Sequence, residues 1–303
     1  MSKKQRAEGK ELRAESKNRK HNKAFRSVAL VAIAIALIFY LIPIYWLIAT
    51  SLKRWPDIFA VKFLFKPTLD NYVGLMTVRV MTPEGPQIVG ASSYPRQLLN
   101  SVIIGFVSTA LAVSLGTMSA YAFSRFQVKG KGDLMFFILS TRMLPPVVVV
   151  IPLFLMYRAL RMFDTHFGLI LLYTTFNVSF ATWLMKGFID EIPKEYEEAA
   201  MVDGYSRFKA FVKIVLPQAV TGIAATAVFC LITAWNEFAF ALIMTMDKSR
   251  TAPPALASRM GSSGVEWGQI AAGAFIFLLP VAVFTFIMRK HLLRGVTFGA
   301  IKR

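Results

Sequence analysis

The sequence is poor in cysteine, histidine and charge. Its 303 residues include 1 cysteine, Cys230, and 3 histidines. A disulfide framework needs paired cysteines and a zinc site needs several Cys or His ligands, so we expect neither, and we predict no bound metal. Charged residues make up 17% of the chain, against about 25% in soluble proteins, and the mean hydropathy is +0.52. This composition is typical of a membrane protein.

Acidic residues are also scarce, with 17 Asp and Glu against 35 Lys and Arg. A basic excess of this size indicates binding to nucleic acid or to an anionic membrane face. The leader, residues 1–26, holds 10 of the basic residues and only Phe25 to stack on a base. Single-stranded nucleic acid is bound largely on aromatic side chains. We therefore expect a leader that faces solvent or lipid headgroups, and no nucleic-acid partner.

Six stretches are long and apolar enough to cross a bilayer, which takes about 20 residues. They cover residues 27–52, 97–124, 134–157, 165–185, 214–246 and 267–288. Arg142 interrupts the third stretch and Glu237 the fifth. No short alternating strands occur, so a barrel is excluded and the spans must be helices. We predict an all-α, polytopic membrane protein with six transmembrane helices.

The predicted organisation places a retained anchor behind the leader, because the first apolar run is longer than that of a signal peptide. The predicted segments are the leader 1–26, a first transmembrane helix 27–50, an external loop 51–96, a five-helix transmembrane domain 97–288 with an internal loop 187–218, and a tail 289–303. With the amino terminus inside, the inner segments carry 23 Lys and Arg and the outer loops 11. The positive-inside rule therefore predicts that both termini are cytoplasmic.

The loop 187–218 has a pattern of its own. Residues 194–202 favour a helix that Gly204 would end, and Ser206 would cap a second short helix with apolar residues at helical spacing. Small and acidic residues gather in the first helix and directly after it: Ala199, Ala200, Glu195, Glu197, Glu198 and Asp203. Acidic residues fit poorly against anionic lipid. We therefore expect this loop to dock on another protein.

The spacing in this loop resembles a known signature. Glu198-Ala199-Ala200, Asp203-Gly204, Ile214 and Leu216-Pro217 resemble the EAA motif of the membrane-embedded permease subunits of ABC importers. Further matches resemble the carbohydrate-uptake branch, in particular the second permease of maltose-type transporters: Asn100-Ser101, residues 143–146, residues 235–238 and residues 294–302. The resemblance covers about residue 28 to the end.

The resemblance implies a type I ABC importer permease fold in a bacterial inner membrane. It implies that Glu198, Ala199, Ala200, Asp203, Gly204, Ile214, Leu216 and Pro217 form an element that couples transport to ATP hydrolysis. It also implies the partners: a second permease, two copies of an ATP-binding subunit that holds ATP and Mg²⁺, and an external solute-binding protein. The chain itself has no GxxxxGK[ST] loop and no nucleophile–base set, so we expect no enzyme activity and no cofactor of its own.

Polar residues within the spans suggest a translocation route lined by Arg142, Asn177, Asn236 and Glu237, since a charge at mid-bilayer costs about 2.5–3.5 kcal/mol. Arg142 and Glu237 alternatively pair with each other or extend to the nearer interface. Three prolines at 145, 146 and 152 predict a kinked or broken third span.

The expected cargo is a sugar, sugar alcohol, glycerol or related polyhydroxyl solute, with glycerol phosphate as a variant that Arg142 would suit. The alternative is a secondary transporter or channel that works alone. That class usually shows internal repeats, and the two halves of this sequence show none.

Overall fold

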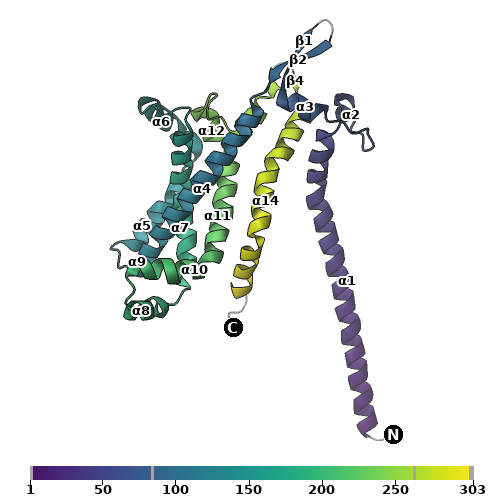
Figure 1. Cartoon of the computed structure of the whole chain (residues 1–303). Helices are drawn as coiled ribbons and strands as arrows, with labels where there is room; N and C mark the ends of the chain where they lie inside the picture. The colour runs from purple at the N-terminus through teal and green to yellow at the C-terminus, as the bar shows by residue number, and fades with distance from the viewer. Residues whose placement is uncertain (1–2, 83–84, 262–263, 300–303) are drawn as a thin grey trace.

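The computed structural model describes the backbone of residues 3–82, 85–261 and 264–299, which form a bundle of helices with two small hairpins (Figure 1). The first and last residues of the predicted leader and tail, 1–2 and 300–303, lie outside the described residues. The predicted all-α architecture is confirmed, and the hairpins are an addition that the sequence patterns did not indicate.

The elements follow one another along the chain. They are α1 Lys3–Ser51, α2 Trp55–Phe59, α3 Asp70–Met76, β1 Thr77–Thr82, β2 Gly85–Ala91, α4 Tyr94–Arg125, α5 Lys131–Ser140, the 3₁₀ turn η1 Thr141–Met143, α6 Pro146–Ala159, α7 His166–Asp190, α8 Glu195–Val202, α9 Arg207–Ala210, the π segment η2 Phe211–Val215, α10 Leu216–Gln218, α11 Val220–Trp235, α12 Ala239–Met244, α13 Ala252–Ala257, β3 Met260–Gly261, β4 Gly264–Val265 and α14 Trp267–Gly299. Both sheets are antiparallel pairs, β1 with β2 and β3 with β4.

Four helices are long and apolar enough to cross a membrane: α4, α7, the Arg26–Ser51 part of α1 and the Trp267–Lys290 part of α14. The other two predicted spans are each broken. The α5–η1 segment meets α6 at 91°, and Arg207–Gln218 meets α11 at 75°. The chain therefore has four such helices in its described part, or up to six if each bent pair is one span.

The break in the third span lies where proline disrupts helical geometry. Leu144 and Pro145 are extended, with ψ of 121° and 131°, because a residue before a proline is disfavoured in the helical region. The predicted kink in the third span is thus a sharp turn between η1 and α6.

The fifth span was predicted to be continuous over residues 214–246. This prediction is wrong for a single helix, since α11 ends at Trp235 and α12 begins at Ala239.

The centre of the bundle is a close contact between α4 and α7. At Gly116 of α4, an added Cβ would lie 2.5 Å from the Cβ of Ala181 on α7. The main buried cluster joins α4, α6, α7, α11 and α12 and comprises Ile104, Val150, Tyr157, Leu169, Leu172, Tyr173, Ala234, Phe240 and Met244. Trp235 also packs inward, stacked on Phe277 of α14. These contacts hold the broken spans against the straight ones.

The bundle has two different ends (Figure 1). One end carries β1, β2 and α3, and we call it the hairpin end. The other carries α8, α9 and α10, and we call it the α8 end. Helix α1 lies beside α14 at the edge, and the side chains of its spanning part, such as Phe39 and Tyr40, are mostly exposed to the surroundings.

Candidate functional site

The first candidate site is the turn between α8 and α9, where most of the predicted coupling residues gather. Gly204 has φ of +86°, a left-handed conformation that glycine adopts without the penalty a side chain would incur. The backbone N–H of Tyr205 donates to the carbonyl of Ala200 at 3.0 Å and closes α8. Ser206 caps α9 by accepting from the N–H of Lys209 at 3.3 Å. The local structure predicted for this loop is therefore confirmed.

The motif residues divide between surface and interior. Glu198, Ala199, Asp203 and Gly204 are exposed, whereas Ala200 is buried. The exposed side therefore presents two carboxylates next to a small side chain and a glycine. This is a surface that another protein can approach closely.

The return from α9 to the bundle is fixed by packing. Leu216 contacts a buried cluster at the α8 end that consists of Ala120, Met185, Ile189, Ile192, Phe211, Val215 and Ala219. Ile214 is half-buried, and Pro217 is exposed in α10. The sequence motif therefore combines an exposed turn with the residues that hold this turn to α7 and α4.

Glu197 differs from its acidic neighbours, because its side chain is buried and takes no part in the exposed surface expected to dock on another protein. Its carboxylate accepts from Nε of Arg125 and, at 2.8 Å, from the hydroxyl of Tyr121. Arg125 also donates through Nη2 to the carbonyl of Ile192 at 2.8 Å. The side chains of Arg125 and Glu197 are 7% and 6% exposed. Helical periodicity was the available signal, since Glu197 and Ala200, three residues apart, share the buried face of α8.

The second candidate site is a cavity at the break in the third span. Arg142, Asn177 and Glu237 line it together with Tyr173, and its volume is about 180 Å³. The structure therefore brings together three of the four predicted pathway residues. The fourth, Asn236, lines a different groove, between α11 and α14.

Only some of the polar groups that line this cavity have hydrogen-bond partners. Glu237 accepts from the hydroxyl of Tyr173 at 2.7 Å and caps α12 by accepting from the backbone N–H groups of Phe240 and Ala241. Asn177 donates to the carbonyl of Cys230, but its buried Oδ1 has no hydrogen-bond partner. Arg142 lies over the ring of Phe180 at 4.9 Å.

Arg142 and Glu237 do not form a pair. The described residues contain five ion pairs, and none of them joins these two side chains. Glu237 is therefore occupied in holding α12, while the guanidinium of Arg142 has no carboxylate partner within the described part of the chain and the buried Oδ1 of Asn177 accepts no hydrogen bond there.

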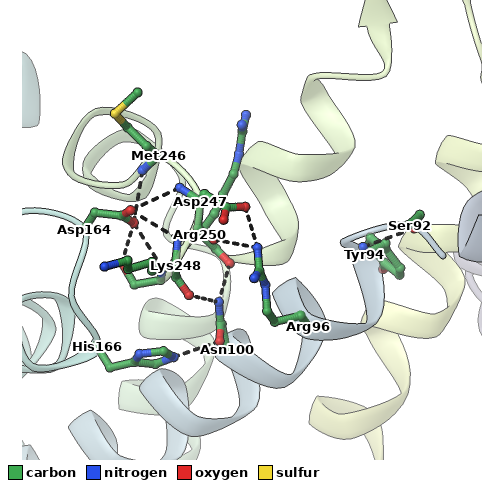
Figure 2. Close-up of polar contacts among 11 residues, drawn as sticks. Ser92, Tyr94, Arg96, Asn100, Asp164, His166, Met246, Asp247, Lys248 and Arg250 are labelled. Atoms are coloured by element: carbon green, nitrogen blue, oxygen red, sulfur yellow. Dashed lines mark hydrogen bonds and ion pairs between the residues drawn. The ribbon is translucent and has the colours of Figure 1, made fainter. Parts of the chain in front are cut away.

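A third polar site, at the hairpin end, was not predicted (Figure 2). Asp164 lies between α6 and α7 with φ of +54°. Its carboxylate accepts the backbone N–H groups of four successive residues, 246–249, at 3.1 to 3.2 Å. Burial raises the pKa of Asp164, but these four donors outweigh that effect and hold the pKa below its usual range.

The same segment is tied to α4. Nδ2 of Asn100 donates to the carbonyls of Lys248 and Arg250, and Oδ1 of Asn100 lies 2.8 Å from Nε2 of His166 (Figure 2). Arg96 pairs with Asp247. The loop after α12 is therefore fastened to α4 and to the start of α7. The Asn100-Ser101 match was the sequence signal for this site, but a motif does not show which loop a side chain reaches.

The comparisons with known proteins agree with this geometry. Residues 112–297 match the family described as the binding-protein-dependent transport system inner membrane component, more than half of the chain. The chain belongs to this family. It is the membrane-spanning permease subunit of a transport system, and the family is not one of enzymes.

Two relatives support the carbohydrate-uptake resemblance. The chain is 37% identical over 266 residues to the trehalose transport system permease protein SugB of Mycobacterium tuberculosis, covering 86% of this chain and 92% of the relative. It is 30% identical over 280 residues to the trehalose/maltose transport system permease protein MalG of Thermococcus litoralis, covering 91% and 97%. The prediction of an ABC importer permease is confirmed.

The fold has also been seen before. A chain of a bacterial ABC transporter that imports the acidic polysaccharide alginate superposes with a TM-score of 0.68 at 19% identity, covering 89% of this chain and 97% of that chain. At this identity, the likeness shows the fold alone. It confirms the type I importer permease architecture.

Proposed function

We propose that this permease subunit forms half of the import pathway for a sugar or another polyhydroxyl solute. Its relatives are named for trehalose and maltose transport, and the spans offer a cavity lined by the polar side chains of Arg142, Asn177 and Glu237. The single observation that carries the proposal is the exposed turn Glu198–Gly204 within a chain of this family. The second permease, two ATP-binding subunits and a solute-binding protein complete the transporter.

In this proposal the α8 end faces the cytoplasm, where the ATP-binding subunits bind Glu198, Ala199 and Asp203. These subunits hold ATP and Mg²⁺, and the chain itself binds no cofactor. The hairpin end faces the outside and the solute-binding protein, and both termini are cytoplasmic. The predicted segment boundaries, with the domain 97–288 as the transport core, stay part of the proposal.

Reconstitution tests this function. The complete transporter in proteoliposomes is expected to take up solute only with ATP and with the loaded solute-binding protein. Uptake by this chain alone, driven by an ion gradient, would contradict the proposal and favour the alternative function, a secondary transporter. Its family already argues against that alternative.

The cavity has a separate test within the same vesicles. Arg142→Gln and Asn177→Leu change the charge and the polarity of the cavity lining. The KM for uptake is therefore expected to rise, while the ATP-binding subunits still assemble with the permeases. Asn236→Leu, in the other groove, is the matched control. If Asn236→Leu impairs uptake while the two cavity variants transport normally, then the pathway runs along α11 and α14 instead.

A further inference from the structure

The contact between Glu197 and the end of α4 has no place in the docking surface, yet it is the most deeply buried ion pair of the described residues. Glu197 lies on α8 beside Glu198, but Glu197 is buried against α4, whereas Glu198 is exposed. One turn of α8 therefore carries an exposed carboxylate that a partner protein can bind, and a buried carboxylate that binds α4.

The inward group reaches a helix that is distant in the sequence. Arg125 is the last residue of α4, and Tyr121 lies one turn before it. The ring of Tyr121 packs on Phe211 of η2 with 4.5 Å between ring centroids. The end of α4 thus holds α8 through Glu197, the preceding loop through the Ile192 carbonyl, and η2 through Phe211.

The covalent connections of α8 do not reach α4. The loop 191–194 joins α8 to α7, and the turn at Gly204 joins it to α9. Helix α4 packs closely against α7 at Gly116 and contacts α11 through Gly105, next to Trp235. A displacement of α8 therefore reaches α7 through the loop 191–194, and it reaches α4 directly through the contact of Glu197 with Arg125 and Tyr121.

We propose that Tyr121, Arg125 and Glu197 form a clasp that makes α4 move together with the α8–α9 turn during transport. These three are positioning residues and do not contact the solute. The inference rests on the proposed function and assigns the transmission of movement to a particular ion pair. Burial suits this role, because a buried charge left without its partner is strongly unfavourable, so the two helices resist separation.

The test measures ATP hydrolysis and uptake in the same proteoliposomes, using the complete transporter. Glu197→Gln and Arg125→Gln are expected to co-purify with the ATP-binding subunits and to hydrolyse ATP, while the ATP used per solute taken up rises about tenfold, an effect typical of coupling between sites. The double variant is expected to lose no more than either single variant, since the clasp acts as a unit.

Two further variants keep the test decisive if Glu197→Gln folds poorly. Tyr121→Phe removes one hydrogen bond and little volume, so it is expected to fold and to shift the same ratio by a smaller factor. Asp190→Asn breaks an exposed ion pair at the same end of the bundle and is expected to leave the ratio unchanged.

The outcomes separate the clasp from the proposed function. If the wild-type transporter shows no ATP-dependent uptake, the proposed function fails. If it transports normally but the clasp variants keep the wild-type ratio of ATP to solute, the clasp is overturned. A parallel loss of hydrolysis and uptake at constant ratio would show a purely structural ion pair and would also overturn it.

Discussion

At the residue scale, single side chains and one glycine decide what the two ends of the bundle can do. Gly204 shapes the exposed turn, and Asp164 gathers the loop at the opposite end. Both adopt positive φ, which is uncommon outside glycine and better tolerated by aspartate than by most residues. Each allows an experiment on one residue.

Gly204→Val tests the exposed turn. No atom lies within 4 Å of an added Cβ there, so the penalty is conformational, about 1–2 kcal/mol for a left-handed residue with a side chain. We expect a protein that inserts in the membrane but couples ATP hydrolysis poorly to uptake, measured in proteoliposomes. Gly187→Ala in α7, also without neighbours at Cβ, is the control. Normal uptake by Gly204→Val would argue against a coupling role for this turn.

Asp164→Asn tests the fastening of the loop 246–249. Because the folded-state pKa is lowered, ionised Asp164 stabilises the fold above its ordinary pKa of 3.8, and this contribution disappears as the pH falls through the lowered pKa. Asparagine keeps one acceptor oxygen and tolerates the left-handed backbone. We expect a loss of about 1–3 kcal/mol near neutral pH.

The measurement is thermal unfolding in detergent as a function of pH. The difference between wild type and Asp164→Asn should shrink on acidification, whereas Asp247→Asn, which breaks the exposed pair with Arg96, should change little at any pH. A difference that is constant with pH would show that the charge of Asp164 has no part in it.

At the element scale, the fold depends on where helices approach closely and where they break. The sequence indicated the existence and approximate ends of α4 and α7 and the start of α14, because long uncharged runs must be helical in lipid. It indicated a disturbance at Pro145 and Pro146 but not its 91° angle. Val150 and Tyr157 of α6 pack in one buried cluster with residues of α7 and α12, a contact that no local pattern records.

Gly116→Ala tests the close approach of α4 and α7. The new methyl group would overlap Ala181, and its nearest neighbours include backbone atoms that cannot rotate away. Overpacking of this kind typically costs about 1–3 kcal/mol. The expected result is a lower melting temperature in detergent, while Gly105→Ala, where the nearest atom is 3.4 Å away, should melt close to wild type. Equal melting of both variants would mean that the helices are free to separate.

At the scale of the whole molecule, the two ends of the bundle must lie on opposite sides of the membrane. The charge distribution predicts which side is which, and this orientation stays a prediction. The α8 end carries the exposed turn, and the hairpin end carries the exposed ion pair of Lys62 with Asp57. Site-directed labelling can therefore determine the orientation.

In a Cys230→Ser background, Lys62→Cys is expected to react with a membrane-impermeant maleimide in intact cells. Lys194→Cys, in the loop before α8, is expected to react only after the membrane is opened. Both parent side chains are exposed lysines, so the two variants form a matched pair. The reverse pattern would place the α8 end outside and contradict the proposed binding of ATP-binding subunits there.

The sequence by itself determined the membrane class, the helical architecture, the family resemblance and the turn at Gly204, because chain length, apolar runs and glycine geometry are local properties. Only the tertiary structure decided that Glu197 faces Arg125 while Glu198 faces outward, that Glu237 caps α12 and leaves Arg142 without a carboxylate, and that Asn236 lies apart from Asn177. The capping of α12 is local, but the other arrangements bring together or separate residues tens of positions apart, and they depend on how broken and straight helices pack.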